Sequence, residues 1–372
     1  MLEQNFFELI QVALGRRQQL SATLSATDWE RVYIMAQKQA LVGICFIGVK
    51  KLWDSGIVMP QQLYYQWLAM TAQIQDRNNL LNNYVPKVTE MFRKEGFPCY
   101  ILKGQSIGKL YGDLSPYRQS GDIDVWTAGG RQRICQLSID MFSKVEGLTY
   151  HHIHFPYLKD VEIEAHFIPG YLNSPGHNMR LMKLFLVYEP KADEPSDDAP
   201  IAFNQIYILL HCYMHFLERG MGLRQLMDYY FVLQNKEHHG LSSDDLTCWL
   251  KRTGMMRFAR AAVWVLINVF GMEEQLAICK PDEKEGRFLL KEMLQTGNFG
   301  HHDNRYNWNI SSPLKRFLAN QAWNIHLLTH YPKEIFWSPI AALYRYLSIA
   351  KWRKTIVANS QWDELQKTNT EL

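Results

Sequence analysis

Two aspartates near the middle of the chain, Asp122 and Asp124, have a spacing that suits metal binding. They alternate with Ile123 and Val125 in residues 121–126, a pattern that predicts a strand. Side chains two residues apart on a strand point to the same face, about 7 Å apart along the chain. Two carboxylates on one face repel each other, and a divalent cation offsets that repulsion. Their hard oxygen atoms favour Mg²⁺ or Mn²⁺ over zinc.

A second segment, residues 161–167, alternates in the same way. Its odd-numbered residues are apolar, whereas Glu162, Glu164 and His166 would share the opposite face. If this strand lies beside the first, a third carboxylate joins the two aspartates. Three acidic groups can hold two cations about 3.5–4 Å apart, an arrangement used for phosphoryl or nucleotidyl transfer. The alternative is a solvated sheet face on which both glutamates only meet water.

Candidate phosphate-binding residues precede the aspartates. Lys103 and Gly104 follow a short apolar segment and begin a helix that contains Ser106, so backbone N–H groups and the lysine charge could face a phosphate. An ordinary strand-to-helix turn is the alternative. Arg118 lies four residues before Asp122 and could bind a triphosphate through two hydrogen bonds. It could equally be a surface arginine that balances the aspartates.

Two further pairs lie on predicted helices. His211 and His215 are four residues apart, a spacing that can bind zinc, but no HExxH motif is present. Polar contacts that line a cleft, or satisfied core histidines, are the alternatives. Arg224 and Asp228 are also four residues apart, which predicts an ion pair along one helix. Arg224 could instead contact a phosphate.

A histidine-rich strand is predicted between the two acidic segments. His152 and His154 would share one face of this strand, with His151 beside them. They would line a pocket or lie at the surface, and the sequence leaves both possibilities open.

The elements that must position these residues fall into three regions. We expect an N-terminal helical region over residues 1–95, an α/β core over 96–195 and a C-terminal helical domain over 196–372. Within the core, the order is strand, helix, strand, helix and hairpin, so the fold class is α+β (α/β) with a small mixed sheet. The acidic, proline-rich residues 190–200 predict an exposed linker.

Several boundaries follow from individual residues. A helix is expected to begin at residues 27–29, with Thr27 or Asp28 as its N-cap. Pro60 would open the next helix, and Pro86 would kink or split it. Turn-forming residues predict a loop over 114–121.

Together these motifs resemble the uncharacterised bacterial nucleotidyltransferase family of the DNA polymerase beta-like nucleotidyltransferase superfamily. The resemblance covers roughly residues 101–230 and rests on residues 102–104, Arg118, the run Ser120-Gly121-Asp122-Ile123-Asp124, residues 164–167 and the helical region 211–228. The superfamily usually has Gly-Ser at the strand–helix turn, whereas this chain has Lys103-Gly104. Which group contacts the β- and γ-phosphates is therefore left open.

The resemblance implies a metal-dependent nucleotidyltransferase that moves a nucleoside monophosphate from an NTP to an unidentified acceptor and releases pyrophosphate. The implied catalytic metal ligands for Mg²⁺ (or Mn²⁺) are Asp122, Asp124 and Glu164, and Glu164 could also help to deprotonate an acceptor hydroxyl. The implied nucleotide and phosphate contacts are Lys103, Gly104, Ser106, Arg118, Ser120, Gly121 and Arg224. Further pocket candidates are Glu162, which is a rival third ligand, His166, His211, His215 and Asp228. A non-catalytic nucleotide-binding or partner-binding module on the same fold is the alternative.

Composition limits the class of partner. The 372 residues include 40 Lys and Arg against 37 Asp and Glu, so the small net charge of +3 disfavours long nucleic acid. No apolar run reaches the ~20 residues of a membrane span. Six scattered cysteines without a CxxC pair indicate reduced cytoplasmic thiols. A small molecule or a protein side chain is therefore the expected acceptor, and no motif fixes the oligomeric state.

Overall fold

Helices make up most of the chain and surround one small sheet. The structure, a computed structural model, describes residues 2–193, 196–235, 240–303, 305 and 313–359. The N-terminal helices are α1 (Leu2–Ala13), α2 (Ala26–Lys38), α3 (Val42–Asp54) and α4 (Gln61–Lys94). Next to the sheet are α5 (Gly104–Gly108), a 3₁₀ segment (Lys109–Tyr117), α6 (Gly130–Phe142) and α7 (Pro175–Val187). The remaining helices are α8 (Ile201–Glu218), α9 (Leu223–Gln234), α10 (Ser243–Arg252), α11 (Met256–Phe270), α12 (Glu283–Thr296), α13 (Pro313–Leu327) and α14 (Pro332–Asn359).

The sheet has four strands in the order β1–β2–β4–β3. They are β1 (Cys99–Leu102), β2 (Ile123–Thr127), β3 (His152–His154) and β4 (Ile163–His166). Strand β2 is antiparallel to β1 and parallel to β4, and β3 is antiparallel to β4. The α+β fold class and the expected order of strands and helices are confirmed.

The two faces of the sheet pack against different partners, because successive strand residues point to opposite sides. On one face, Ile101, Val125 and Ala165 belong to a core shared with the second half of α4 and with α6. On the other face, Trp126 belongs to the larger core of the N-terminal and C-terminal helices. Asp124 is two residues before Trp126 and therefore faces this larger helical region.

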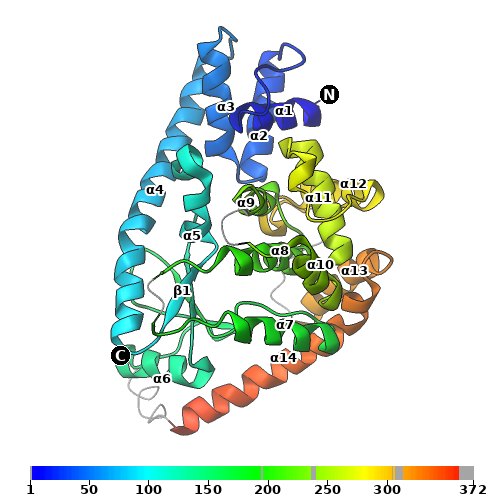
Figure 1. Cartoon of the computed structure of the whole chain (residues 1–372). Coiled ribbons are helices and arrows are strands. Elements are labelled where there is room, and N and C mark those ends of the chain that lie inside the picture. Colours follow the sequence, from blue (N-terminus) through cyan, green and yellow to red (C-terminus); the bar gives the residue numbers. More distant parts are fainter. Residues whose placement is uncertain (1, 194–195, 236–239, 304, 306–312, 360–372) are drawn as a thin grey trace.

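Helix α4 runs along one side of the molecule, from the N-terminal helices to the sheet (Figure 1). Trp67 in its first half packs into the larger core, whereas Leu81 and Val88 pack into the sheet core. Pro86 lies inside the helix without ending it, so a split at this proline is wrong. Burial on both sides of Pro86 outweighs the single backbone hydrogen bond that proline removes. In the described ranges, no helix is long and apolar enough to cross a membrane.

Two other predicted boundaries are corrected. Helix α2 begins earlier than expected, because Ser25 is its N-cap and exchanges hydrogen bonds with Asp28 in a capping box. Neither Thr27 nor Asp28 is therefore the cap. The expected loop over 114–121 is helical in its first half, since the 3₁₀ segment continues to Tyr117.

The acidic segment before α8 is more than an exposed linker. Ile101 of β1 donates its backbone N–H to the Asp197 carbonyl at 2.7 Å, and Asp198 forms a parallel bridge to the same residue. The segment thus covers the free edge of β1, which would otherwise leave unpaired backbone groups. Residues 194–195, in the middle of the expected linker, lie outside the described residues.

The close approach of α1 and α3 gives a test of the packing. A Cβ atom at Gly48 would meet the Leu9 carbonyl oxygen at 2.6 Å and Leu9 Cδ1 at 2.9 Å. We expect Gly48→Ala to lower the free energy of unfolding by about 1–3 kcal/mol, because overpacking outweighs the higher helix propensity of alanine. Thermal and urea unfolding would measure the change.

Gly176→Ala is the matched control for this substitution. Gly176 also lies in a helix, α7, and the nearest atom to a Cβ added there is Arg180 Nη1 at 3.8 Å. The control should be neutral or slightly stabilising. Equal effects of the two substitutions would contradict the close packing of α1 on α3.

Candidate active site

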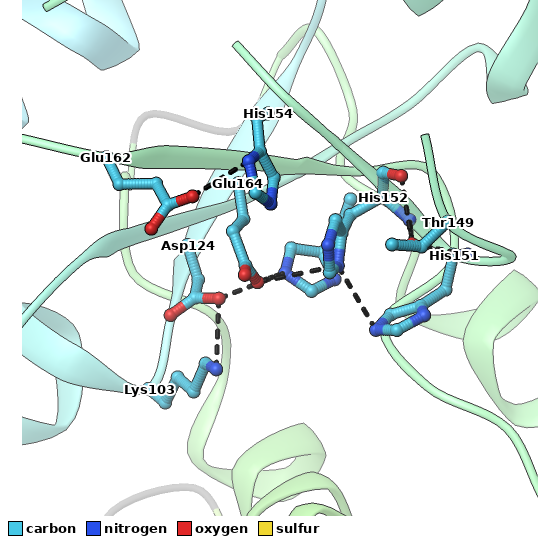
Figure 2. A network of polar contacts seen from close by, with 9 residues as sticks. Lys103, Asp124, Thr149, His151, His152, His154, Glu162 and Glu164 are labelled. Carbon is cyan, nitrogen blue, oxygen red and sulfur yellow. Dashed lines mark hydrogen bonds and ion pairs between the residues drawn. The ribbon is translucent and has the colours of Figure 1, made fainter. Parts of the chain in front are cut away.

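Asp124 belongs to a cluster of polar side chains on the sheet (Figure 2). Only 1% of its surface is exposed. Its Oδ1 accepts a hydrogen bond from Lys103 Nζ at 3.0 Å and lies 3.0 Å from His166 Nε2. Its Oδ2 is also buried, but has no hydrogen-bond partner among the described residues. Because a buried carboxylate oxygen without a partner is costly, this atom is well suited to bind a cation.

Glu164 lies beside Asp124 because the parallel register of β2 and β4 pairs these two residues. Its Oε2 lies 3.2 Å from His166 Nε2 and 3.4 Å from His152 Nδ1. One donor atom from each of Asp124, Glu164 and His166 lies within 4.8 Å of the others. Two carboxylates in this arrangement fit a hard divalent cation.

Positive groups balance these carboxylates. Burial acts to lower the pKa of His166, but its hydrogen bonds with Asp124 and Glu164 raise that pKa above the ordinary value of 6.5. Burial acts to raise the pKa of Glu164, but the hydrogen bond with His166 and the charge of Lys103 lower it to about 2. Burial likewise opposes the charge on Lys103, but Asp124 and Asp122 raise its pKa. The acidic cluster therefore carries its own counter-charges.

Lys103 reaches Asp124 from an unusual backbone conformation. It joins β1 to α5 with φ +38° and ψ −141°. Residues with a side chain rarely adopt positive φ, and such a conformation costs on the order of 1–3 kcal/mol. Gly104 follows with φ +42°, which glycine tolerates. The helix that begins here has only five residues, so the dipole expected at its start is small.

The polar cluster borders a cavity of about 700 Å³, large enough for a small-molecule ligand. Twelve residues that the sequence singled out line its wall: Lys103, Gly104, Arg118, Ser120, Gly121, Asp122, Asp124, His154, Glu162, His211, Arg224 and Asp228. Six others are not part of the described wall: Ser106, His151, His152, Glu164, His166 and His215. Of these, Glu164 and His166 contact each other beside Asp124, whereas Ser106 is buried in α5.

Arg118 is buried, with 3% of its surface exposed, so the surface-arginine alternative is wrong. Its Nε and Nη2 donate to the two carboxylate oxygens of Asp228 at 2.7 and 2.8 Å, and Nη1 donates to Ser120 Oγ at 2.6 Å. Tyr111 also donates its hydroxyl to Asp228, at 2.6 Å. This bidentate pair joins the loop before β2 to α9.

The expected ion pair between Arg224 and Asp228 is therefore wrong. Asp228 forms its ion pair with Arg118 instead, and none of the described carboxylates forms an ion pair with Arg224. Its guanidinium carbon lies 5.5 Å from the ring centroid of Phe299. Burial and then the charge of Arg118 lower the pKa of Arg224. A partly buried arginine on the cavity wall is a favourable contact for an anionic ligand.

The histidine pair of α8 divides between two cavities. His211 lines the main cavity, whereas His215 lines a neighbouring cavity of about 450 Å³, and Phe299 lines both. Burial lowers the pKa of His211 well below its usual value and that of His215 to about 3. Both are therefore neutral near pH 7. Their rings are in contact, 4.4 Å between centroids, as expected for cavity-lining or core histidines.

Glu162 is placed differently from Glu164, although both point to the same side of the strand. Its side chain is 54% exposed and lies 2.8 Å from His154 Nδ1 at the cavity rim. His152, by contrast, is buried. The face that carries these residues is thus solvated at Glu162 and His154 but covered at Asp124 and His166.

Asn78 of α4 holds the loop that leads into β2, and the sequence did not single it out. Its amide donates to the carbonyls of Pro116 and Arg118 at 2.8 and 2.7 Å. Asn78 lies on the same helical stripe as the apolar Ile74 and Leu81. A polar residue on a buried stripe was the one signal for this contact.

Three more cavity residues were missed. Arg77, also on α4, donates to the carbonyls of Gly121 and Asp160 and so joins the loops before β2 and β4. Asn298 and Phe299 reach the cavity from the segment after α12. No local pattern marks these residues, because their role depends on contacts between distant segments.

Comparison with known proteins gives one match. A protein-family model described as "Uncharacterised nucleotidyltransferase" matches residues 25–271, more than half of the chain. The matched range contains all four strands, helices α2–α11 and every site residue that the sequence singled out. No curated protein and no solved structure matches the chain.

Removing the carboxylate of Asp228 tests the buried ion pair. Asp228→Asn leaves the Arg118 charge buried without a counter-charge, so we expect the free energy of unfolding to fall by about 3–5 kcal/mol. Urea unfolding would measure it. Glu283→Gln removes the exposed ion pair with Arg287 on α12, whose side chains are 65% and 68% exposed, and should have almost no effect. Similar losses in both variants would contradict this role of Asp228.

The charge on His166 gives a pH dependence in metal-free protein. Because its folded pKa is raised, its stabilising contribution is fully present below pH 6.5 and is lost as pH rises through the folded pKa. The stability difference between wild type and His166→Gln should therefore shrink above pH 6.5. Urea unfolding in chelator at several pH values would measure it.

His152→Gln is the control, and its effect should have the opposite sign. Burial lowers the pKa of His152 to about 3. Wild type should therefore lose stability relative to this variant as pH falls from 6.5 towards 3. The same pH trend in both variants would show that His166 is not the charged member of the cluster.

Proposed function

The chain belongs to the uncharacterised nucleotidyltransferase family, and on that premise we propose that it is a metal-dependent nucleotidyltransferase. The enzyme binds an NTP, transfers the nucleoside monophosphate to an acceptor and releases pyrophosphate. The acceptor is a small molecule or a protein side chain, because the near-neutral net charge disfavours long nucleic acid.

One observation carries this proposal: an acidic pair, the buried Asp124 and the partly buried Glu164, stands next to a cavity with positive groups. Asp124 and Glu164 are paired across two parallel strands, and Asp124 Oδ2 has no partner among the described residues. Lys103 and Arg224 line the same cavity. Carboxylates for a cation beside cations for a phosphate are the groups that a metal–triphosphate needs.

Asp122, Asp124 and Glu164 would hold Mg²⁺ (or Mn²⁺), which would neutralise charge on the phosphate oxygens and align the reacting groups. Glu164 is the better third ligand, because Glu162 is exposed and interacts with His154. Metal dependence and this ligand set are part of the proposal.

The positive residues have different roles. Lys103 and Arg224 would contact phosphate oxygens, since both line the cavity and Arg224 has no described carboxylate partner. The guanidinium of Arg118 is occupied by Asp228 and Ser120, which supports a positioning role for the loop before Asp122. With its pKa at about 2, Glu164 is a weak proton acceptor at neutral pH, which supports metal binding over general-base catalysis.

A non-catalytic nucleotide-binding or partner-binding module is the second candidate. It is favoured by the contacts of Asp124 with Lys103 and His166, which balance the carboxylate without a metal ion. Calorimetry over the four NTPs, with and without Mg²⁺, separates the candidates. Nucleotide binding that does not require Mg²⁺, with no pyrophosphate release for any acceptor, would favour the module.

Asp122→Asn is the sharper test of the enzyme, because Asp124 also holds Lys103 and His166 and its loss would disturb the fold. Asp122 has no side-chain hydrogen bond among the described residues and lines the cavity. We expect the substitution to lower Mg²⁺-dependent pyrophosphate release about 100-fold or more, a loss of ~3 kcal/mol in transition-state stabilisation. Release would be measured from each NTP with pools of small-molecule and protein acceptors.

Asp160→Asn is the matched control, since Asp160 lines the same cavity but interacts with Tyr84 at its rim. It should keep activity within a factor of about three. Full activity of Asp122→Asn would exclude this aspartate as a metal ligand.

A further inference from the structure

Three histidines lie together beside the acidic pair. His152 pairs with His166 in the register of β3 and β4, and His151 directly precedes β3. One ring nitrogen from each lies within 4.8 Å of one from each of the others. His152 and His166 are buried, and His151 is partly buried. Figure 2 shows His151 and His152 on the side of the cluster away from Asp124.

The spacing of the ring nitrogens suits a tetrahedral metal. His151 Nε2 lies 3.2 Å from His152 Nδ1. Zinc binds imidazole nitrogen at about 2.0–2.1 Å, so two such nitrogens at a tetrahedral angle lie about 3.3–3.4 Å apart. The His166 ring lies close to both, with its centroid 5.3 Å from that of His151 and 5.0 Å from that of His152.

Two ring nitrogens in this cluster are buried and have no hydrogen-bond partner among the described residues: His151 Nδ1 and His166 Nδ1. Buried polar atoms normally have a partner. With His151 facing His152 through Nε2, the free Nδ1 of His166 is the atom that indicates a missing ligand on this side of the cluster. His166 Nε2 faces Asp124 and Glu164. A histidine that binds a metal through one nitrogen typically donates its other N–H to a carboxylate, and His166 has this arrangement.

We propose that His151, His152 and His166 form a second metal site, which binds zinc or a similar transition-metal ion. Neutral imidazole nitrogens suit zinc, nickel, copper and iron, whereas Mg²⁺ prefers the oxygen atoms of the neighbouring carboxylates. The two sites therefore select different ions. His166 is the link between them, because it would bind the transition metal on one side and hold Asp124 and Glu164 on the other.

A competing set of three donors is less favourable. His152, His154 and Glu164 also have donor atoms within 4.8 Å of one another. However, His154 is 40% exposed, and its Nδ1 already lies 2.8 Å from Glu162. The three-histidine site joins β3 to β4, so its metal would stabilise the edge of the sheet next to the acidic pair.

Cobalt binding to the full chain tests the site. The protein is freed of any histidine tag, stripped with chelator and titrated with Co²⁺ in excess Mg²⁺, and visible absorption reports tetrahedral coordination. We expect one Co²⁺ per chain, displaced by one Zn²⁺ in calorimetry. His151→Ala should weaken Co²⁺ binding about 10-fold or more. His151 has no contact with Asp124 or Glu164 in the described structure, so the acidic site is left intact.

His154→Ala is the matched control from the same strand and should keep the Co²⁺ affinity within a factor of about two. Asp122→Asn should also keep the Co²⁺ affinity of wild type. The test is therefore independent of the proposed Mg²⁺ chemistry, because a protein that releases no pyrophosphate should still bind Co²⁺. Two results would overturn the proposal. One is that wild type with Co²⁺ shows no absorption of tetrahedral cobalt, and the other is that His154→Ala loses as much Co²⁺ affinity as His151→Ala.

A folding defect in the His151 variant is covered by two further measurements. Circular dichroism checks each variant, and His151→Gln, which keeps a polar side chain, should lose Co²⁺ affinity in the same way. In wild type, Zn²⁺ should raise the melting temperature, since a ligand that binds only the folded state stabilises it. The measurement uses Zn²⁺ concentrations at which wild type and His154→Ala both stay folded. An unchanged melting temperature of wild type under these conditions would contradict the site.

Discussion

The burial of Asp124 is the constraint on which the rest of the site depends. An isolated carboxylate that is removed from water costs several kcal/mol unless charges and hydrogen bonds compensate it. Lys103 and His166 provide that compensation at Oδ1. Lys103 makes this contact from the turn after β1, in which its φ is positive. The need for compensation accounts for a histidine at the end of β4, where a smaller or apolar residue would leave the aspartate uncompensated.

The loop before β2 is held in place by segments from both sides of the sequence. Asn78 of the N-terminal part binds two of its carbonyls, and Asp228 of the C-terminal part binds Arg118 within it. These contacts fix the position from which Asp122 enters the cavity. The small sheet therefore provides the carboxylates, but helices α4 and α9, which are distant in the sequence, hold the loop that leads to them.

Local patterns predicted which side chains share a face of the sheet. Alternation in residues 161–167 placed Glu164 and His166 on one face, and the parallel register of β2 and β4 brings that face beside Asp124. Contacts at long sequence separation could not be predicted in this way. Arg118 and Asp228 are 110 residues apart, and a helix-local rule gave Asp228 the wrong partner, Arg224.

Two predicted helix boundaries, at Pro86 in α4 and at the start of α2, were wrong because they also depend on contacts between residues. Pro86 was expected to kink or split its helix because proline removes a backbone hydrogen bond. The split is wrong, because packing of α4 against the sheet outweighs that loss. The cap of α2 was missed because a capping box is a reciprocal contact, in which Ser25 and Asp28 each satisfy the backbone of the other. The roles of the site residues are predictions, which the placement of most of them around one cavity and of Glu164 beside Asp124 supports.

The pairing of Arg118 with Asp228 has a consequence for how the protein is made. During synthesis, Arg118 emerges from the ribosome long before Asp228, which lies 110 residues further along the chain. Domains form as their segments become available, from the N-terminus onwards. The strands can pair early, yet Arg118 in the loop before β2 lacks its counter-charge, Asp228, until α9 has been translated. A polypeptide that stops before α9 therefore holds the acidic strands without the arrangement that prepares them for a ligand.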